Sequence, residues 1–233
     1  MRTGLCLWLL VFSMTIISSC SQDPYEKGEG AYSLLRGDFV EAYVNKGGMV
    51  ESVTTDDGDL LLLKEKQTAK WITTSDSTYR CMLYYNKVKD TNGQPLADVL
   101  LLGRVPCPEI TPLSDFDKEF RSDPVKFESI WMSKSGKYLN MSLQLMTGLT
   151  DDTTAVQKLA FVSDTLMVHS DHSRTLFLRL YHDQGGVPEY YSTQAYVSIP
   201  TKSIDADSVR ISINTYKGMV EKAIRVNNSL NHE

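Results

Sequence analysis

The chain has 233 residues, of which 42% are hydrophobic and 23% are charged, and its formal net charge at pH 7 is −5. This length is sufficient for two domains of about 100 residues each. The acidic balance argues against a nucleic-acid partner, because such a partner favours a basic protein face.

The first nineteen residues have the pattern of a lipoprotein signal peptide. Arg2 supplies a positive charge, an apolar stretch runs from Leu5 to Ile17, and the small residues Ser18 and Ser19 precede Cys20. The apolar stretch is shorter than the roughly 20 residues of a transmembrane helix. We therefore predict that residues 1–19 are removed and that Cys20 carries the lipid. A plain secretory signal and a buried N-terminal helix are the alternatives.

The lipid on Cys20 predicts a membrane anchor, since each buried methylene group adds about 0.8 kcal/mol and several chains act together. Ser21 stands where an aspartate would favour retention in the inner membrane. We therefore expect the outer membrane, with the protein facing either the periplasm or the cell exterior. Residues 20–30 are polar and contain Pro24, Gly28 and Gly30, which predicts a flexible tether.

Residues 31–106 have the pattern of a small β-barrel or sandwich. Asn92-Gly93 is a strong hairpin-turn signal, and five or six strands within about 75 residues are typical of such folds. The strands are expected at residues 32–44, 49–54, 59–63, 71–74, 79–88 and 96–103. Three prolines within residues 105–112 then predict an extended linker between two domains.

Residues 107–233 are also predicted to be mainly strands, after a short helix over Ser114–Arg121 that begins with Ser114 as its cap. Leucine and methionine alternate with polar residues over 138–145, and similar alternation recurs at 175–181 and 209–214. Such a period of two, with one apolar face, predicts an antiparallel β-sandwich. Further strands are expected at 127–132, 190–199 and 223–226, whereas 157–167 fits either a strand or a helix.

Several longer stretches resemble the NigD-like lipoproteins. They are DFVEAYV at 38–44, YRCMLYYNKVKDTNG at 79–93, RVPCP at 104–108, PVKFESIWMSKSGKYLNMSLQL at 124–145 and LRLYHDQGGVPEYYSTQAYVSIP at 178–200. The resemblance spans the mature chain and implies an OB-like β-barrel over residues 31–106 followed by a β-sandwich over residues 107–233. It also implies a role like that of a bacteriocin-immunity protein, because the family is named after a bacteriocin gene cluster. It supplies no catalytic residues.

Cys81 and Cys107 are the two cysteines that remain once the signal peptide is removed and Cys20 is lipidated. In a hairpin centred on Asn92-Gly93, Cys81 opposes Arg104, so Cys107 lies roughly 10 Å further along the strand. A disulfide requires Cα atoms within about 7 Å. A bulge or a fold back at the neighbouring prolines would have to close that gap. A Cys81–Cys107 disulfide and two free thiols therefore both remain open.

Metal and catalytic motifs are weak in this sequence. His169, His172 and His182 are the nearest approach to a metal cluster, but a hairpin loop at 169–174 explains the first two more simply. The sequence has neither a Gly-x-Ser-x-Gly elbow nor a phosphate-binding glycine loop. We therefore predict no metal site, no cofactor, no catalytic residue and no enzyme activity.

Tyrosine is abundant, and five tyrosines are candidates for ligand contact: Tyr84, Tyr85, Tyr190, Tyr191 and Tyr196. Aromatic side chains on a sheet face can contact proteins or stack on sugars, although cross-strand packing explains them equally well. The main hypothesis is a non-enzymatic interaction module with an unidentified protein partner. The alternative is a glycan-binding accessory lipoprotein.

Overall fold

The computed structural model describes residues 34–116 and 119–226. The predicted signal peptide, Cys20 and the tether lie outside these residues. The chain divides into two units, residues 1–34 and 35–233, and the second unit contains all the strands described below. The all-β fold class predicted from the sequence is confirmed, because the helical segments of the described residues are two single 3-10 turns, η1 (Leu113–Asp115) and η2 (Thr201–Ser203).

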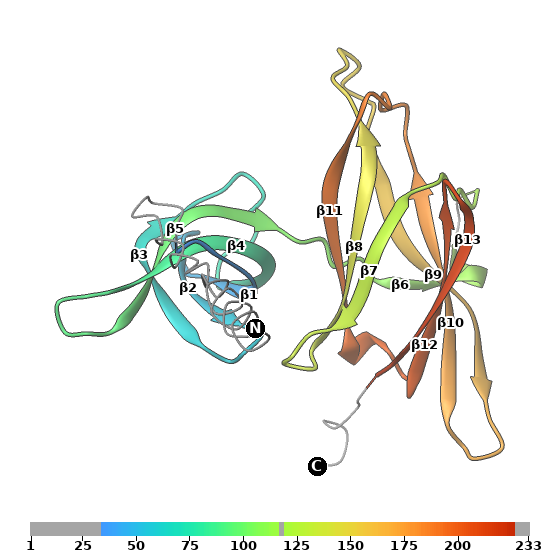
Figure 1. The fold of residues 1–233 in the computed structure, drawn as a ribbon, viewed down its shortest axis with the longest axis horizontal. Coiled ribbons are helices and arrows are strands. Elements are labelled where there is room, and N and C mark those ends of the chain that lie inside the picture. The colour runs from blue at the N-terminus through green and yellow to red at the C-terminus, as the bar shows by residue number, and fades with distance from the viewer. Residues whose placement is uncertain (1–33, 117–118, 227–233) are drawn as a thin grey trace, which may run out of the picture. The chain divides into compact units, whose positions relative to one another are not determined.

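The first domain is a closed five-stranded barrel (Figure 1). The strand order around it is β1-β2-β3-β5-β4, and every neighbouring pair is antiparallel except β3 and β5. This is the five-stranded barrel type of the predicted OB-like fold. The strands are β1 (Arg36–Val44), β2 (Val50–Thr55), β3 (Leu60–Gln67), β4 (Ser77–Lys89) and β5 (Pro95–Arg104).

Alternation along each strand fills the interior of the barrel. In β4, Cys81, Leu83 and Tyr85 are at most 1% exposed, whereas the residues between them face outward. Val40 and Ala42 of β1 meet them from the neighbouring strand. The core is thus a direct result of the period-two side-chain direction of a strand.

Next to its turn, the β4–β5 hairpin pairs Lys89 with Pro95, one residue away from the register expected for a turn centred on Asn92-Gly93. Cys81 pairs with Arg104, and a β-bulge lies between Tyr84 and Tyr85. Gly93 has a φ of +81°, a left-handed conformation that glycine adopts without strain. The Asn92-Gly93 signal therefore correctly predicted the hairpin and its turn, whereas the pairing of Cys81 with Arg104 also depends on the bulge.

Cys81 and Cys107 are both free thiols in the structure, and the possible disulfide between them stays a prediction. Cys81 points into the barrel core and is fully buried. Cys107 lies three residues beyond Arg104, the partner of Cys81, and its thiol is 3.7 Å from the carbonyl oxygen of Val105. The β5 bulge brings Cys107 one residue closer to the partner of Cys81 than the register beside the turn would, and three residues still separate Cys107 from Arg104.

Two of the elements predicted from the sequence differ in the structure. Residues 71–74 form a loop rather than a strand, because the amide groups of Thr73 and Thr74 donate to the hydroxyl of Tyr79 instead of to a neighbouring strand. The helix expected over Ser114–Arg121 is replaced by η1, in which Ser114 lies inside the turn and its hydroxyl donates to Asp115. Local polar side chains compete here with regular backbone hydrogen bonding.

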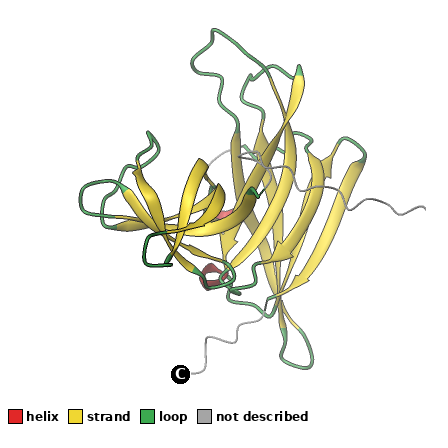
Figure 2. Ribbon diagram, turned by 60° about the vertical axis from the view of Figure 1, so that its left-hand side comes forward, coloured by secondary structure: helices red, strands yellow, loops and turns green. Residues whose placement is uncertain are grey.

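The second domain is a sandwich of two sheets (Figure 2). One sheet has the order β13-β12-β10-β9-β6 and the other the order β11-β8-β7. The strands are β6 (Ile110–Pro112), β7 (Lys126–Met132), β8 (Tyr138–Thr147), β9 (Lys158–Val168), β10 (Arg174–Asp183), β11 (Tyr191–Pro200), β12 (Ser208–Thr215) and β13 (Gly218–Arg225).

The inner faces of the two sheets form one hydrophobic core. The apolar side chains predicted to share a face in β8 and β12 are buried there. They include Leu139, Met141 and Leu143 of β8, and Val209, Ile211 and Ile213 of β12. Residues 157–167, which fitted either a strand or a helix, belong to strand β9.

The pairing of the sandwich strands is mixed rather than wholly antiparallel. β10 and β12 run parallel, and so do β6 and β9. The predicted linker therefore contributes β6 to the edge of the larger sheet, where Pro112 ends the strand. An edge position tolerates proline, because the missing N–H faces no partner strand there.

Candidate functional site

Strand β3 begins with four consecutive leucines whose environments alternate. Leu61 and Leu63 point into the barrel and are 1% and 7% exposed, whereas Leu60 and Leu62 are 65% and 55% exposed. Outward positions on a solvated sheet are usually polar. Leu60 and Leu62 therefore need an explanation that the barrel itself does not provide.

Strand β5 extends this apolar surface. Leu96 pairs with Leu62 across the parallel β3–β5 junction, and Leu101 is 58% exposed. The bulge leaves Leu100 without a pairing partner in β4, so the consecutive residues Leu100 and Leu101 are both exposed. An ion pair of 2.9 Å between Lys64 and Asp98 also lies between these two strands. We call Leu60, Leu62, Leu96, Leu100 and Leu101 the leucine face.

The five candidate tyrosines do not form one platform. Tyr85 is 1% exposed inside the barrel, and its hydroxyl donates to Asp38 at 2.8 Å. Burial and this hydrogen bond raise the pKa of Tyr85 to about 12. Tyr190 and Tyr191 are 77% and 52% exposed at the start of β11. Tyr191 and Tyr196 lie on opposite faces of β11, because they are an odd number of residues apart.

Tyr84 and Tyr196 are the two candidates that share an environment. Burial raises the pKa of Tyr196, and the neighbouring Tyr84 and Glu128 raise it further. Ser142 and Gln194 each donate a 2.8 Å hydrogen bond to the carboxylate of Glu128. These hydrogen bonds hold the pKa of Glu128 below its usual value, with Gln194 contributing most. Tyr196 is thus a partly buried tyrosine with Tyr84 and a fixed carboxylate nearby, and its ring packs edge-on against Phe39, with 5.2 Å between the ring centres.

Arg80 forms a buried polar network that the sequence analysis did not single out. Its guanidinium donates two hydrogen bonds of 2.7 Å to the carboxylate of Asp56 and one of 3.3 Å to Asn140. It also lies 4.1 Å from the ring centre of Tyr138. Ser198 donates to the same Asn140 oxygen at 2.7 Å. The outer, polar face of β8 is thereby buried rather than solvated, although Arg80 Nε and Asn140 Nδ2 have no hydrogen-bond partner.

The histidines of the sequence are separated in the structure. His169 and His172 lie in the loop between β9 and β10, where a hairpin loop was expected. His182 is 1% exposed in the sandwich, with Nδ1 3.0 Å from the carbonyl oxygen of Asp123. Across residues 34–116 and 119–226, no three His, Cys, Asp or Glu side chains are grouped so as to hold a metal ion. The described part of the chain also contains no helix long and apolar enough to span a membrane.

The protein is therefore a two-domain all-β protein, with an OB-like barrel followed by a two-sheet sandwich. The family model for the NigD-like C-terminal beta sandwich domain matches residues 109–226, just over half of the chain. The chain therefore belongs to the NigD-like family. No curated protein matches it by sequence.

Several solved structures have the same fold. A NigD-like immunity protein from Bacteroides caccae is 24% identical with a TM-score of 0.65, covering 80% of this chain and 91% of that one. A protein from Parabacteroides distasonis, provisionally named as toxin-related, is 14% identical with a TM-score of 0.60, covering 84% and 94%. A Bacteroides fragilis protein, provisionally named a lipoprotein, is 12% identical with a TM-score of 0.59, covering 83% and 98%. At these identities the likeness shows the fold alone.

Proposed function

We propose that the mature protein is a non-enzymatic lipoprotein of the outer membrane that binds a protein partner, in a role like that of a bacteriocin-immunity protein. The leucine face carries this proposal. It places exposed leucines on two adjacent strands of a rigid, closed barrel. Exposed apolar patches of this kind are typical of protein interaction sites.

The energetics of the leucine face favour a protein over a small molecule. Fully burying one leucine side chain contributes about 1.5–3 kcal/mol, so a partner that covers several of them gains substantial affinity. The outer surface of a closed barrel is convex, whereas small-molecule sites are concave. The ion pair between Lys64 and Asp98 adds a polar feature that could set the orientation of a partner.

The comparisons support the same proposal. One structural neighbour is named as an immunity protein and another, provisionally, as toxin-related. The lipid anchor is supported by the lipobox that ends at Cys20 and by the neighbour provisionally named a lipoprotein. An anchored immunity protein would meet an incoming toxin at the envelope.

A protection assay tests the proposed role. The gene would be deleted from the source bacterium, and the strain would be challenged with culture supernatants of competing strains. We expect the wild-type gene to restore survival and a folded Leu62→Asp/Leu101→Asp variant to fail. Met219→Asp is the matched control, because Met219 is 63% exposed on the sandwich. Equal survival of the deletion strain and the complemented strain would contradict the immunity role, and protection by the double variant would contradict the role of the leucine face.

A glycan-binding function is the second candidate, and the Tyr84–Tyr196 pair beside Glu128 favours it. An aromatic ring next to a fixed carboxylate and amide can stack on a sugar and bind its hydroxyl groups. Retention of the protein on immobilised envelope polysaccharides would test this candidate. Tyr84→Ala should then reduce retention, whereas Tyr190→Ala, at an exposed site outside this pair, should not.

A further inference from the structure

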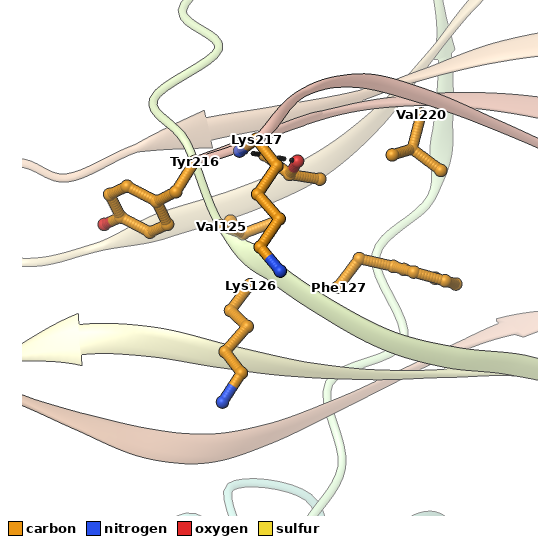
Figure 3. A pocket seen from close by; sticks show the side chains of 7 residues that line it. Val125, Lys126, Phe127, Tyr216, Lys217 and Val220 are labelled. Carbon is orange, nitrogen blue, oxygen red and sulfur yellow. Dashed lines mark hydrogen bonds between the residues drawn. The ribbon is translucent and has the colours of Figure 1, made fainter.

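A pocket of about 320 Å³ opens at one edge of the sandwich, between β7 and the β12–β13 turn (Figure 3). Its floor is held in place by backbone contacts. The amide of Val125 donates to the carbonyl oxygen of Asn214 at 3.0 Å, and the Asn214 side chain donates to the carbonyl oxygen of Ser122 at 2.6 Å. Val125 itself is fully buried. The pocket therefore has a preformed base.

The walls of this edge pocket are mainly apolar. Val125, Phe127, Val220 and the ring of Tyr216 line it. The Tyr216 hydroxyl donates to Glu189 at 3.1 Å, which fixes the position of the ring. Partial burial, and then this hydrogen bond, raise the pKa of the Tyr216 hydroxyl to about 12.

Lysines surround the opening of the edge pocket. Lys126 and Lys217 line it, and the ammonium of Lys222 lies 5.4 Å from the ring centre of Phe127. Figure 3 shows the Lys217 side chain reaching from the β12–β13 turn towards β7. The ammonium of Lys126 donates to Gln144, a neutral partner, and its charge also acts on Glu128, whose pKa it helps to lower. Within the residues that the structure describes, the ammonium of Lys217 has no hydrogen-bond or ion-pair partner.

Carboxylates lie near this edge as well, and each of them has a partner of its own. Glu189 accepts the hydrogen bond of the Tyr216 hydroxyl. The carboxylate of Asp123 accepts a hydrogen bond from the backbone amide of Gln184, with 2.7 Å between nitrogen and oxygen. Glu221 pairs with Arg210. None of these carboxylates forms an ion pair with Lys126 or Lys217 among the described residues, so both ammonium groups remain available at the rim.

We propose that the edge pocket binds a small organic anion: a carboxylate or sulfonate carried on a compact aromatic or aliphatic body. The apolar walls would take the body, and Lys126 and Lys217 would meet the anionic group. A volume of about 320 Å³ lies at the lower end of ligand-pocket sizes, which limits the ligand to a small molecule. This inference does not depend on the leucine face.

Anilinonaphthalene sulfonate is a suitable fluorescent probe, because it combines an aromatic body with one negative charge. Phenylnaphthylamine has a similar body without the charge and serves as the neutral comparison. We expect the wild-type protein to bind the anionic probe more tightly, with an affinity that falls as salt rises. Using the Leu62→Asp/Leu101→Asp variant as the host protein would remove any probe binding at the leucine face.

Variants then locate the binding site. Lys126→Gln/Lys217→Gln should weaken binding of the anionic probe at least about fivefold through the loss of two cations, and Val220→Phe should abolish binding by filling the pocket. Lys46→Gln, at an exposed barrel lysine, is the matched control and should bind like the wild type. Displacement by naphthoate or by octanoate would show whether the aromatic or the aliphatic body is preferred. The proposal is overturned if neither competitor displaces the probe, if the neutral probe binds equally well, or if both pocket variants, confirmed as folded by circular dichroism, bind like the control.

Discussion

Replacing Arg80 by methionine tests whether the buried polar network stabilises the protein. The Arg80 side chain is 1% exposed and that of Asp56 is 19% exposed, and two hydrogen bonds of 2.7 Å join them. Methionine keeps most of the apolar length of the side chain but removes the charge and its donors. The substitution therefore isolates the electrostatic part of the interaction from the packing.

The expected cost follows from what the substitution leaves behind. Removing one partner of a buried ion pair typically costs 3–5 kcal/mol, because the other charge is left uncompensated. Asp56 keeps some contact with solvent, so Arg80→Met should lower the free energy of unfolding by about 3 kcal/mol. Asp56→Asn leaves the more deeply buried guanidinium without its carboxylate and should cost about 4 kcal/mol. The double variant should cost less than the sum, with a coupling of about 2 kcal/mol.

Urea unfolding followed by tryptophan fluorescence and circular dichroism would measure these differences. Trp71 lies in the barrel and Trp131 in the sandwich, so single-tryptophan versions would report on each domain. Lys64→Met is the control, because it breaks an exposed ion pair and should cost no more than about 1 kcal/mol. If Arg80→Met costs no more than this control, or if the two single variants are additive, the network does not contribute in the way described.

Three further predictions concern the anchor, the thiols and acid stability. Cys20→Ser should abolish acylation, which mass spectrometry and detergent partitioning would detect. If the variant keeps the mass increment and the detergent partitioning of the wild type, the lipobox interpretation is wrong. Cys81 and Cys107 should both react with an alkylating reagent in denaturant without prior reduction, whereas a linked peptide pair in a non-reducing digest would contradict the free thiols of the structure. Burial opposes ionisation of Glu41, but hydrogen bonds from Lys137 and Tyr138 outweigh it and lower its pKa below 4.5. Its contribution to stability is therefore present above the unfolded pKa and lost as pH falls through the folded pKa, so the wild type should lose more stability than Glu41→Gln between about pH 6 and about pH 3 in acid-dependent urea unfolding.

Local patterns in the sequence were sufficient to locate most strands and both domains. Alternating apolar residues identified β8, β10 and β12, because a strand places every second side chain on the same face. The turn signal Asn92-Gly93 identified the β4–β5 hairpin, but Cys81 pairs with Arg104 only because the bulge beside Tyr85 shifts the register by one residue. Both kinds of information lie within a few residues of chain, so they can be read without the fold.

Candidate functional residues were much harder to identify from the sequence. The tyrosines were chosen because they cluster along the chain, but Tyr84 and Tyr85 point to opposite sides of the barrel wall. The leucine face was missed, because four consecutive leucines show no alternation between exposed and buried positions. One signal in the sequence could have revealed it. The outward positions of β3 change from leucine at residues 60 and 62 to lysine at residues 64 and 66, so the two leucines stand where polar residues are expected.

The sequence by itself determined where the strands and turns lie and, through its resemblance to a family, the order of the two domains. The tertiary structure alone decided which strands pair in parallel, which leucines remain exposed, how Arg80 is buried and where the edge pocket opens. The physical reason is the range of the interactions involved. Strand formation and turn geometry depend on neighbours in sequence, whereas the parallel pairing of β10 with β12 joins segments more than thirty residues apart. Such contacts form only when distant segments pack together in the two hydrophobic cores.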